Sequence, residues 1–348
     1  MAIRFHWRLP QGGDRPGRPL DSSAPDLEEQ IPFCREAEAF GIDSLLVDFG
    51  LAKADSIVLS TALGMATSKI RFLIAYRSGL LAPTSFVQQL NTLSALIDGR
   101  LSLNIVAGSS PEEQRSYGDY LEHDSRWART DEFLTVARGI WRDGSTDFDG
   151  EHYRVERAAV RAAFVASDGR RAPEIYVGGS SESAREVAAK HATCWLMPAD
   201  APARVATQIA PMLRRGVEAG IRSMVFARAT REEAIAAAHA YRDLASPKVA
   251  PTNGIDSQMI LRAYERAADE WLTPWLWTGA MAAHGTMSIA IVGSYDEVAD
   301  ALLSYHAAGV TQFILSGHPK REELQIFGTE VLGRVREREA EAATAVAS

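Results

Sequence analysis

Short apolar runs alternate with longer amphipathic runs about eight times along this chain of 348 residues. Each short run resembles a buried strand, and each longer run repeats its apolar residues at helical spacing. This alternation predicts a TIM-type (β/α)8 barrel, with an open doubly wound α/β sheet as the alternative. No GxGxxG follows the first run, which favours the barrel. The expected strands are Ile3–Trp7, Ser44–Val47, Arg71–Ala75, Leu101–Val106, Ile175–Val177, Cys194–Met197, Ser223–Ala227 and Gln312–Leu315.

Two stretches interrupt the alternation and are expected to be insertions within one domain that spans residues 1–348. Residues 142–173 carry turn and short-strand signals, whereas residues 246–288 are punctuated by proline and glycine and contain Trp271, Trp275 and Trp277. Long inserts in barrels often act as lids, but tryptophans also suit a dimer surface. Both interpretations stay open for residues 246–288.

Composition excludes several classes of function. The formal net charge is −8 with both signs interspersed, so no basic face is available to a nucleic acid. The N-terminus is too polar for a signal peptide, and no run approaches the roughly 20 apolar residues of a membrane span. Cys34 and Cys194 lie in apolar segments and are expected to be buried free thiols, as in a cytoplasmic protein. HExxH, CxxC and GxSxG motifs are absent, so hydrolytic and metal-dependent sites lack their usual residues.

The segment YVGGSSESAREVAA, residues 176–189, is the clearest candidate binding site. An apolar strand ends at Gly178 and Gly179, and Ser180 and Ser181 then open a helix. Glycines permit close backbone approach, and the N–H groups and dipole of a helix N-terminus favour an anion. The segment predicts either a phosphate site or a plain helix N-cap.

Further candidates lie near the ends of strands, where barrels hold their chemistry. In LSLNIV, apolar residues alternate with Ser102 and Asn104, so Asn104 is expected to point into the barrel, toward a ligand or neighbouring backbone. His123 and Trp127 precede a helix and suit either a flat cofactor or a structural loop. Arg222 begins the seventh strand, where an arginine either pairs with a carboxylate or binds an anion.

Two histidines complete the candidates. His284 lies in the small-residue segment GAMAAHGTM, which can form a mobile loop, and His318 follows the last strand in ILSGHP. Isolated histidines are more often structural than catalytic, but His318 is expected at the end of the barrel where catalytic groups collect.

These motifs, in this order, resemble the bacterial luciferase-like flavin monooxygenases, and within them the alkanesulfonate monooxygenase group. The resemblance runs from about residue 3 to about residue 335 and rests on FHWRLP, LIAYRSGLLAPT, QQLNTLSALIDGRLSLNIVAGS, HDSRWARTDEF, VGGSS and ILSGHP. It implies a barrel that takes reduced FMN (FMNH2) from a separate NAD(P)H:FMN reductase and uses molecular oxygen through a flavin C4a-(hydro)peroxide. It also implies a homodimer or homotetramer.

The resemblance further implies roles for the candidate residues. The cofactor-binding set would be Asn104, His123, Trp127, Gly179, Ser180 and Ser181. The serines would bind the FMN phosphate, the asparagine the isoalloxazine, and the histidine and tryptophan the flavin edge and phosphate, the tryptophan standing where the family usually has a tyrosine. Arg222 matches an arginine that the sulfonate enzymes use near the substrate, and His318 and His284 are the other expected catalytic residues.

The sequence departs from the sulfonate pattern in its substrate-binding half, at Gly12, Lys53, Pro198, Met224, His284, His318 and Lys320. The mouth of the site is still expected to be cationic, through Lys53, Arg222, His284, His318 and Lys320. We therefore expect a small anionic or carbonyl-bearing substrate, in sulfonate metabolism or natural-product tailoring. The alternatives are a deazaflavin-dependent dehydrogenase or reductase, and a flavin-binding protein without turnover.

Overall fold

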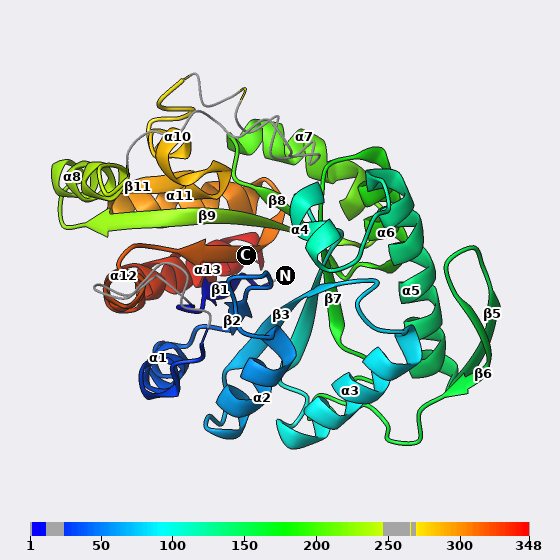
Figure 1. Ribbon diagram of the computed structural model, residues 1–348. Coiled ribbons are helices and arrows are strands. Elements are labelled where there is room, and N and C mark those ends of the chain that lie inside the picture. Colours follow the sequence, from blue (N-terminus) through cyan, green and yellow to red (C-terminus); the bar gives the residue numbers. More distant parts are fainter. Residues whose placement is uncertain (1, 12–23, 246–264, 266–268, 348) are drawn as a thin grey trace.

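The computed structural model describes residues 2–11, 24–245, 265 and 269–347, and its centre is a closed ring of parallel strands (Figure 1). This confirms the predicted TIM-type barrel, because the last strand of the ring pairs back with the first. Around the ring, the strands are β1 (Arg4–Arg8), β2 (Ser44–Val47), β3 (Arg71–Arg77), β4 (Leu101–Val106), β7 (Glu174–Gly178), β8 (Cys194–Pro198), β9 (Glu218–Arg228) and β12 (Val310–Ser316).

Helices connect the strands, and the longer ones surround the ring (Figure 1). They are α1 (Leu27–Phe40), α2 (Ser56–Met65), α3 (Pro83–Leu96), α4 (Pro111–Ser116), α5 (His123–Asp143), α6 (Glu182–His191), α7 (Pro202–Leu213), α8 (Arg231–Arg242), α10 (Met281–His284), α11 (Tyr295–Ala307), α12 (Lys320–Ile326) and α13 (Leu332–Ala347), with the short turns η1 (Thr286–Ser288) and η2 (Phe327–Val331).

Helix α3 shows how the sequence determines one of these helices. It begins at Pro83 and buries Phe86, Leu90 and Leu93, which are spaced by three or four residues and so share one face. The chain turns after it at Gly99, where φ is +68° and an added Cβ would lie 2.3 Å from a backbone oxygen. Both features were predicted from the sequence, and only glycine fits this close approach.

Side chains on the barrel strands alternate between the helices and the interior. On β4, Leu101, Leu103 and Ile105 pack into the main core, whereas Ser102 pairs inward with Glu174. The middle of the barrel holds a separate small core formed by Leu46, Leu73, Ala75, Tyr176, Cys194, Leu196 and Ile314.

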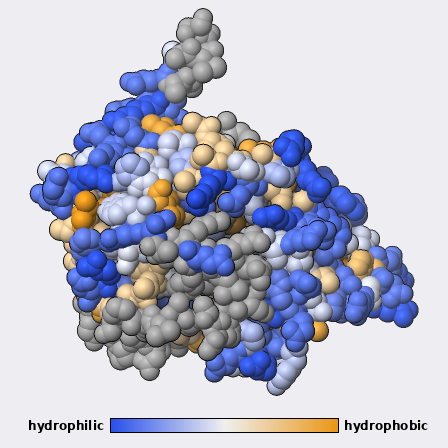
Figure 2. Space-filling model, turned by 90° about the horizontal axis from the view of Figure 1, so that it is seen from above, coloured by the Kyte–Doolittle hydropathy of each residue, from blue (hydrophilic) through white to orange (hydrophobic). Residues whose placement is uncertain are grey.

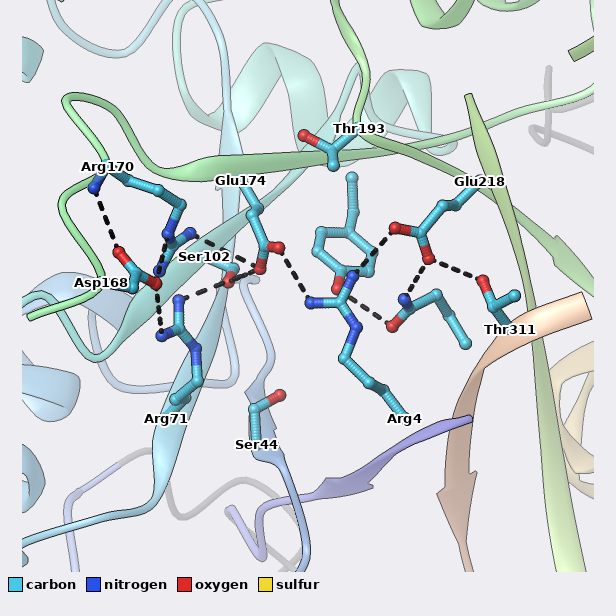
Figure 3. A network of polar contacts seen from close by, with 12 residues as sticks. Arg4, Ser44, Arg71, Ser102, Asp168, Arg170, Glu174, Thr193, Glu218 and Thr311 are labelled. Carbon is cyan, nitrogen blue, oxygen red and sulfur yellow. Dashed lines mark hydrogen bonds and ion pairs between the residues drawn. The ribbon is translucent and has the colours of Figure 1, made fainter. Parts of the chain in front are cut away.

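A charged network closes the N-terminal end of the barrel (Figure 3). The Arg4 guanidinium lies between two carboxylates, 2.8 Å from Glu174 and 3.2 Å from Glu218. Glu218 also accepts hydrogen bonds from Thr311 Oγ1 at 2.6 Å and Gln312 Nε2 at 2.5 Å. Further ion pairs extend the network to Arg71, Asp168 and Arg170. In a TIM barrel, this end contributes stability rather than chemistry.

Strand β9 differs from its predicted form because it begins at Glu218 rather than at Ser223. Its first half carries Glu218, Gly220 and Arg222 on one face, so the continuous apolar run that marks the second half, Met224–Ala227, is missing there. The first half closes the ring against β8, and the second half pairs with β11 (Ala290–Ser294), a strand that was not predicted.

The first insertion lies outside the ring. Helix α5 continues to Asp143 and ends at Gly144, whose φ is +80°, so the insertion starts slightly later than predicted. Strands β5 (Ser145–Asp149) and β6 (Arg154–Ala159) then form an antiparallel hairpin beside α5 (Figure 1).

Of the second insertion, residues 246–264 and 266–268 lie outside the described residues, and the lid interpretation of that stretch stays a prediction. Within the described part, β10 (Leu276–Trp277) pairs with β11. Trp277 is fully buried and packs with Met224 and Phe226, so this ring belongs to the core and to neither a lid nor a dimer surface. Trp271 and Trp275 are half-buried against Trp277 and a core tyrosine.

Hydrophilic residues cover most of the face shown in Figure 2, with hydrophobic residues scattered among them. Among the described residues, none of the helices combines the length and the apolar character needed to span a bilayer. Cys34 and Cys194 are buried free thiols, as predicted. Burial raises the pKa of Cys34 to about 12, so this thiol stays protonated and unreactive.

Candidate functional site

Two adjoining cavities lie at the C-terminal ends of the barrel strands. The larger, of about 300 Å³, is lined by the whole expected cofactor-binding set: Asn104, His123, Trp127, Gly179, Ser180 and Ser181. The smaller, of about 90 Å³, is lined by Arg222, His284 and His318. Arg222 and Met287 line both cavities, so the structure brings all the candidate residues to one place.

A third cavity, of about 730 Å³, lies between the end of α5 and residues 160–171. None of the candidate residues lines it. Barrel enzymes hold their chemistry at the C-terminal ends of the strands, so we place the site by position and chemistry rather than by volume.

The turn after β7 forms a cradle for an anion. Gly179 has φ +142°, and a Cβ there would lie 2.7 Å from Ala184 Cβ and 3.1 Å from Trp127 Cζ2, so glycine is required. Ser181 is the N-cap of α6 and accepts a hydrogen bond from Ala184 N at 3.2 Å. Ser180 Oγ is buried and has no hydrogen-bond partner within the described part of the chain. A phosphate oxygen at this helix N-terminus would supply that partner.

His123 and Trp127 form a wall beside the cradle. Both belong to the start of α5 rather than to the loop before it. Trp127 Nε1 donates to His123 Nε2 at 3.3 Å, and His123 Nδ1 lies 2.9 Å from Asp124 Oδ1. Because Nε2 accepts, the proton that this ring donates lies on Nδ1 in this arrangement. The two side chains therefore hold each other in position at the edge of the larger cavity.

Asn104 lies one strand away from the cradle, on β4. Its register partners are Ala75 on β3 and Tyr176 on β7, both of which belong to the interior core. Asn104 Oδ1 is buried and, within the residues that the structure describes, accepts no hydrogen bond. A ring N–H of a bound ligand would satisfy it. An unpaired hydroxyl at the anion cradle and an unpaired amide oxygen on the next strand fit the phosphate and the ring of FMN.

Arg222 lies within β9, where Pro198 and Ile314 are its register partners. Its guanidinium makes no hydrogen bond or ion pair with the residues described. Burial lowers the pKa of Arg222 to about 10, and the charge of Asp48 works against this shift. An arginine held in this way is available to an anion.

Asp48 is surrounded by cations on this side of the site. Its carboxylate lies 2.5 Å from Arg8 Nε. Burial opposes ionisation of Asp48, but the charges of Arg8, Arg222 and Lys320 outweigh it and hold the pKa of Asp48 well below its usual range. Three cations against one carboxylate leave an excess of positive charge beside the smaller cavity.

The two histidines pack on one tyrosine. His284 stacks on Tyr241 with ring centroids 4.1 Å apart, and its Nε2 donates to the Tyr241 carbonyl at 2.8 Å. It ends the short helix α10 and is not in an open loop. The His318 ring lies 5.4 Å from Tyr241. Each histidine also lines the smaller cavity.

The remaining departures from the sulfonate pattern lie in different places. Lys53 lines neither cavity, and its Nζ donates to the Gln11 carbonyl at 3.0 Å. Arg8 lines the smaller cavity and takes the place of Lys53 in the expected cationic mouth. Met224 and Lys320 line the smaller cavity, whereas Gly12 lies outside the described residues.

Sequence reasoning missed three charged residues of the larger cavity, Asp48, Arg77 and Glu113. Arg77 NH2 donates to Glu113 Oε2 at 3.0 Å, and both side chains line the cavity. The sequence carried a signal for Arg77. It shares the inward face of β3 with Leu73 and Ala75, just as Asn104 lies on the inward face of β4. No group of three or more potential metal ligands is found among the described residues.

Comparison with known proteins agrees with the fold. The family model of the luciferase-like monooxygenases matches residues 4–312. An EDTA monooxygenase from Chelativorans sp. BNC1 superposes with a TM-score of 0.79 at 17% identity, over 97% of this chain and 94% of its own. A riboflavin lyase gives 0.75 at 18% identity, over 97% and 92%.

An F420-dependent tetrahydromethanopterin reductase from Methanopyrus kandleri gives a TM-score of 0.70 at 15% identity, over 96% of this chain and 100% of its own. At these identities the structural matches show the fold, whereas the family model spans most of the chain. The chain therefore belongs to the luciferase-like monooxygenase family and is a flavin-dependent monooxygenase.

Proposed function

We propose that the chain is an FMNH2-dependent, two-component monooxygenase that oxidises a small anionic or carbonyl-bearing substrate. The observation that carries the proposal is a pair of buried atoms with no partner among the described residues, Asn104 Oδ1 on β4 and Ser180 Oγ in the turn after the neighbouring strand β7, both in one cavity. When bound, reduced FMN would supply the electrons that activate molecular oxygen. A separate NAD(P)H:FMN reductase and a homo-oligomeric assembly are part of this proposal.

The residues of the larger cavity would bind and orient the cofactor. Ser180, Ser181 and the free N–H groups at the start of α6 would hold the phosphate. Asn104 would accept a hydrogen bond from the ring. The aromatic and aliphatic side chains of Trp127 and Met287 would help to exclude water from the ring.

The residues of the smaller cavity would bind the substrate. Arg222 would hold an anionic group or stabilise negative charge that develops on a substrate oxygen, since its guanidinium makes no hydrogen bond or ion pair with the described residues. A cavity of about 90 Å³ next to it suits a small group such as a carboxylate or sulfonate. His318 lines the same cavity and would move a proton. Because the sulfonate pattern is altered here, a simple alkanesulfonate is not the expected substrate.

The proposal is tested by supplying reduced FMN from a flavin reductase, isotopically labelled oxygen and a panel of small sulfonates, carboxylates and carbonyl compounds. Product that carries label from oxygen, detected by mass spectrometry, supports the proposal. Some structural relatives use F420, so reduced F420 without oxygen is the matched comparison. Turnover with F420 alone contradicts the proposal, and tight FMN binding without any product favours a flavin-binding protein.

A further inference from the structure

We infer that Arg77 is a cofactor-positioning residue that donates hydrogen bonds to the carbonyl-bearing pyrimidine edge of the flavin ring. The inference rests on the proposed function, because it requires a flavin in the larger cavity. Arg77 ends β3 and lines that cavity, and it does not line the smaller one.

Two of the hydrogen-bonding nitrogens of Arg77 are buried without a partner. Its side chain is only 4% exposed. NH2 donates to Glu113, but Nε and NH1 are out of reach of solvent and have no acceptor within the described part of the chain. Buried polar groups in proteins are nearly always hydrogen-bonded, and unpaired donors on a charged group are costly. Because Arg77 also lines the larger cavity, a ligand bound there could bring the acceptor that these two donors lack.

The guanidinium is held in place from several sides. It lies over the Phe49 ring, 5.0 Å from the centroid, and over the Tyr117 ring at 5.2 Å. Glu113 Oε1 in turn accepts a hydrogen bond from Leu51 N at 3.3 Å, which ties α4 to the loop after β2. Packing of this kind prevents Arg77 from swinging toward water to satisfy its free N–H groups. A preorganised guanidinium discriminates by geometry as well as charge.

The register of the strands places Arg77 next to Asn104. Arg77 pairs with Val106 and Ala75 pairs with Asn104, so Arg77 lies one inward position beyond Asn104 on the neighbouring strand. Neighbouring strands are about 4.8 Å apart. The cavity wall thus offers an acceptor, Asn104 Oδ1, beside two donors. The pyrimidine edge of a flavin presents N3–H, C2=O and N1 in series, one donor beside two acceptors, which is the complementary pattern.

The order of the strands separates Arg77 from the substrate groups. The cradle follows β7, and the next strands around the ring are β4 and then β3. A bound FMN would extend in this order from its phosphate to the edge of its ring. Arg222 lies on β9, which is opposite β3 in the ring. Arg77 therefore lines only the larger cavity, whereas Arg222 lies across the ring, where the two cavities adjoin.

A charge next to the pyrimidine edge has a measurable consequence. Reduction of a flavin places negative charge on the N1–C2 carbonyl part of that edge, and a guanidinium there favours the reduced anion. Arg77 should therefore contribute more to the binding of reduced flavin than to that of oxidised flavin.

The test compares Arg77→Lys with Ser180→Ala, using riboflavin and FMN as probes in both redox states under anaerobic conditions. Riboflavin has the same ring as FMN but no phosphate. We expect Arg77→Lys to weaken the binding of reduced FMN and of reduced riboflavin by the same factor, about tenfold or more. The binding of the oxidised forms should weaken by less. Ser180→Ala should weaken the binding of FMN and leave the binding of riboflavin unchanged. Equal affinities in Arg77→Lys and the unaltered protein would overturn the inference.

Arg129 provides the matched control. It is also mostly buried and paired with a carboxylate, Asp119 at 2.5 Å, but it does not line the cavity. Arg129→Lys should change thermal stability without changing any flavin affinity, and a matching loss of affinity there would count against a specific role for Arg77. If Arg77→Lys fails to fold, the double variant Arg77→Gln/Glu113→Gln removes both charges and carries the same test.

Failure of the inference and failure of the proposed function are distinguishable. An unaltered protein that binds neither FMN nor riboflavin overturns both. An unaltered protein that binds both flavins, with the Arg77 variants binding equally well, overturns only the role of Arg77.

Discussion

Replacing Gly179 with alanine tests whether the anion cradle depends on a single missing side chain. Gly179 has φ +142°, a conformation that residues with a Cβ rarely adopt. The new methyl group would also lie 2.7 Å from Ala184 Cβ on α6 and 3.1 Å from Trp127 Cζ2 on α5. Either the turn or the two helices must move to accommodate it.

The expected cost has two parts. Strain from the backbone conformation costs about 1–3 kcal/mol. Forced contact with two packed side chains costs about 1–3 kcal/mol more. Gly144→Ala is the control, because Gly144 also has a positive φ, +80°, but no heavy atom lies within 4 Å of its Cβ position. That variant should lose only the strain component, about 1–2 kcal/mol.

Urea denaturation of both variants, together with titration of reduced FMN, provides the measurement. We expect Gly179→Ala to be less stable than Gly144→Ala and to bind FMN at least about tenfold more weakly, since Ser180 and the start of α6 are displaced. Gly144→Ala should bind FMN normally. If the two variants lose the same stability and both keep their FMN affinity, then the close packing around Gly179 does not shape the cradle.

Three further predictions concern single side chains. Ser180→Ala should weaken FMN binding by about 1–3 kcal/mol without loss of stability, because Ser180 Oγ has no partner in the described residues. Ser181→Ala should also cost about 1 kcal/mol of stability, because Ser181 is the N-cap of α6, and titration together with denaturation separates the two effects. Arg222→Met should abolish turnover but stabilise the ligand-free protein by up to about 3 kcal/mol, because burial lowers the pKa of Arg222 from 12.5 to about 10. The gain should be full below pH 10 and decline as the pH rises from 10 toward 12.5, and an unchanged midpoint at pH 7 would refute it. Glu38→Gln should lower the free energy of unfolding by about 1 kcal/mol at pH 7, since burial raises the pKa of Glu38 but hydrogen bonds from residues 68–70 outweigh it and lower this pKa to about 2. That stability is present above the usual pKa of 4.5 and is lost as the pH falls through 2, so a pH-independent difference between the variants would contradict the assignment.

The fold was predictable because its signals are local and repeated. Apolar strands and amphipathic helices recur along the chain, and the sequence places each strand of the ring within a few residues except β9. The predicted strand was too short because Glu218, Gly220 and Arg222 interrupt the apolar run in its first half, where Glu218 serves the polar network and Arg222 the site. Long-range pairing also added β11, whose partner Met224 lies far away in sequence.

The candidate site was predictable to the extent that single residues carry the signal. Position at strand ends was enough to gather Asn104, Ser180 and Arg222 into one place. The partners of these residues were not predictable in the same way, because Arg77 and Glu113 meet only after β3 and α4 pack together. Trp277 shows the opposite error, since an apolar residue in a long insertion resembles a lid until its strand is paired.

The network that closes the N-terminal end of the barrel constrains how this chain can diverge. It sets three arginines against three carboxylates in mutual contact. Loss of one charge leaves its partly buried neighbour without an ion-pair partner, so a lone substitution is penalised while a matched pair of substitutions is tolerated. Among relatives, these six positions should change together, whereas positions such as Met224 and His318 at the opposite end can change one at a time. New substrates would then be acquired by single steps at one end of a barrel whose other end drifts only in pairs.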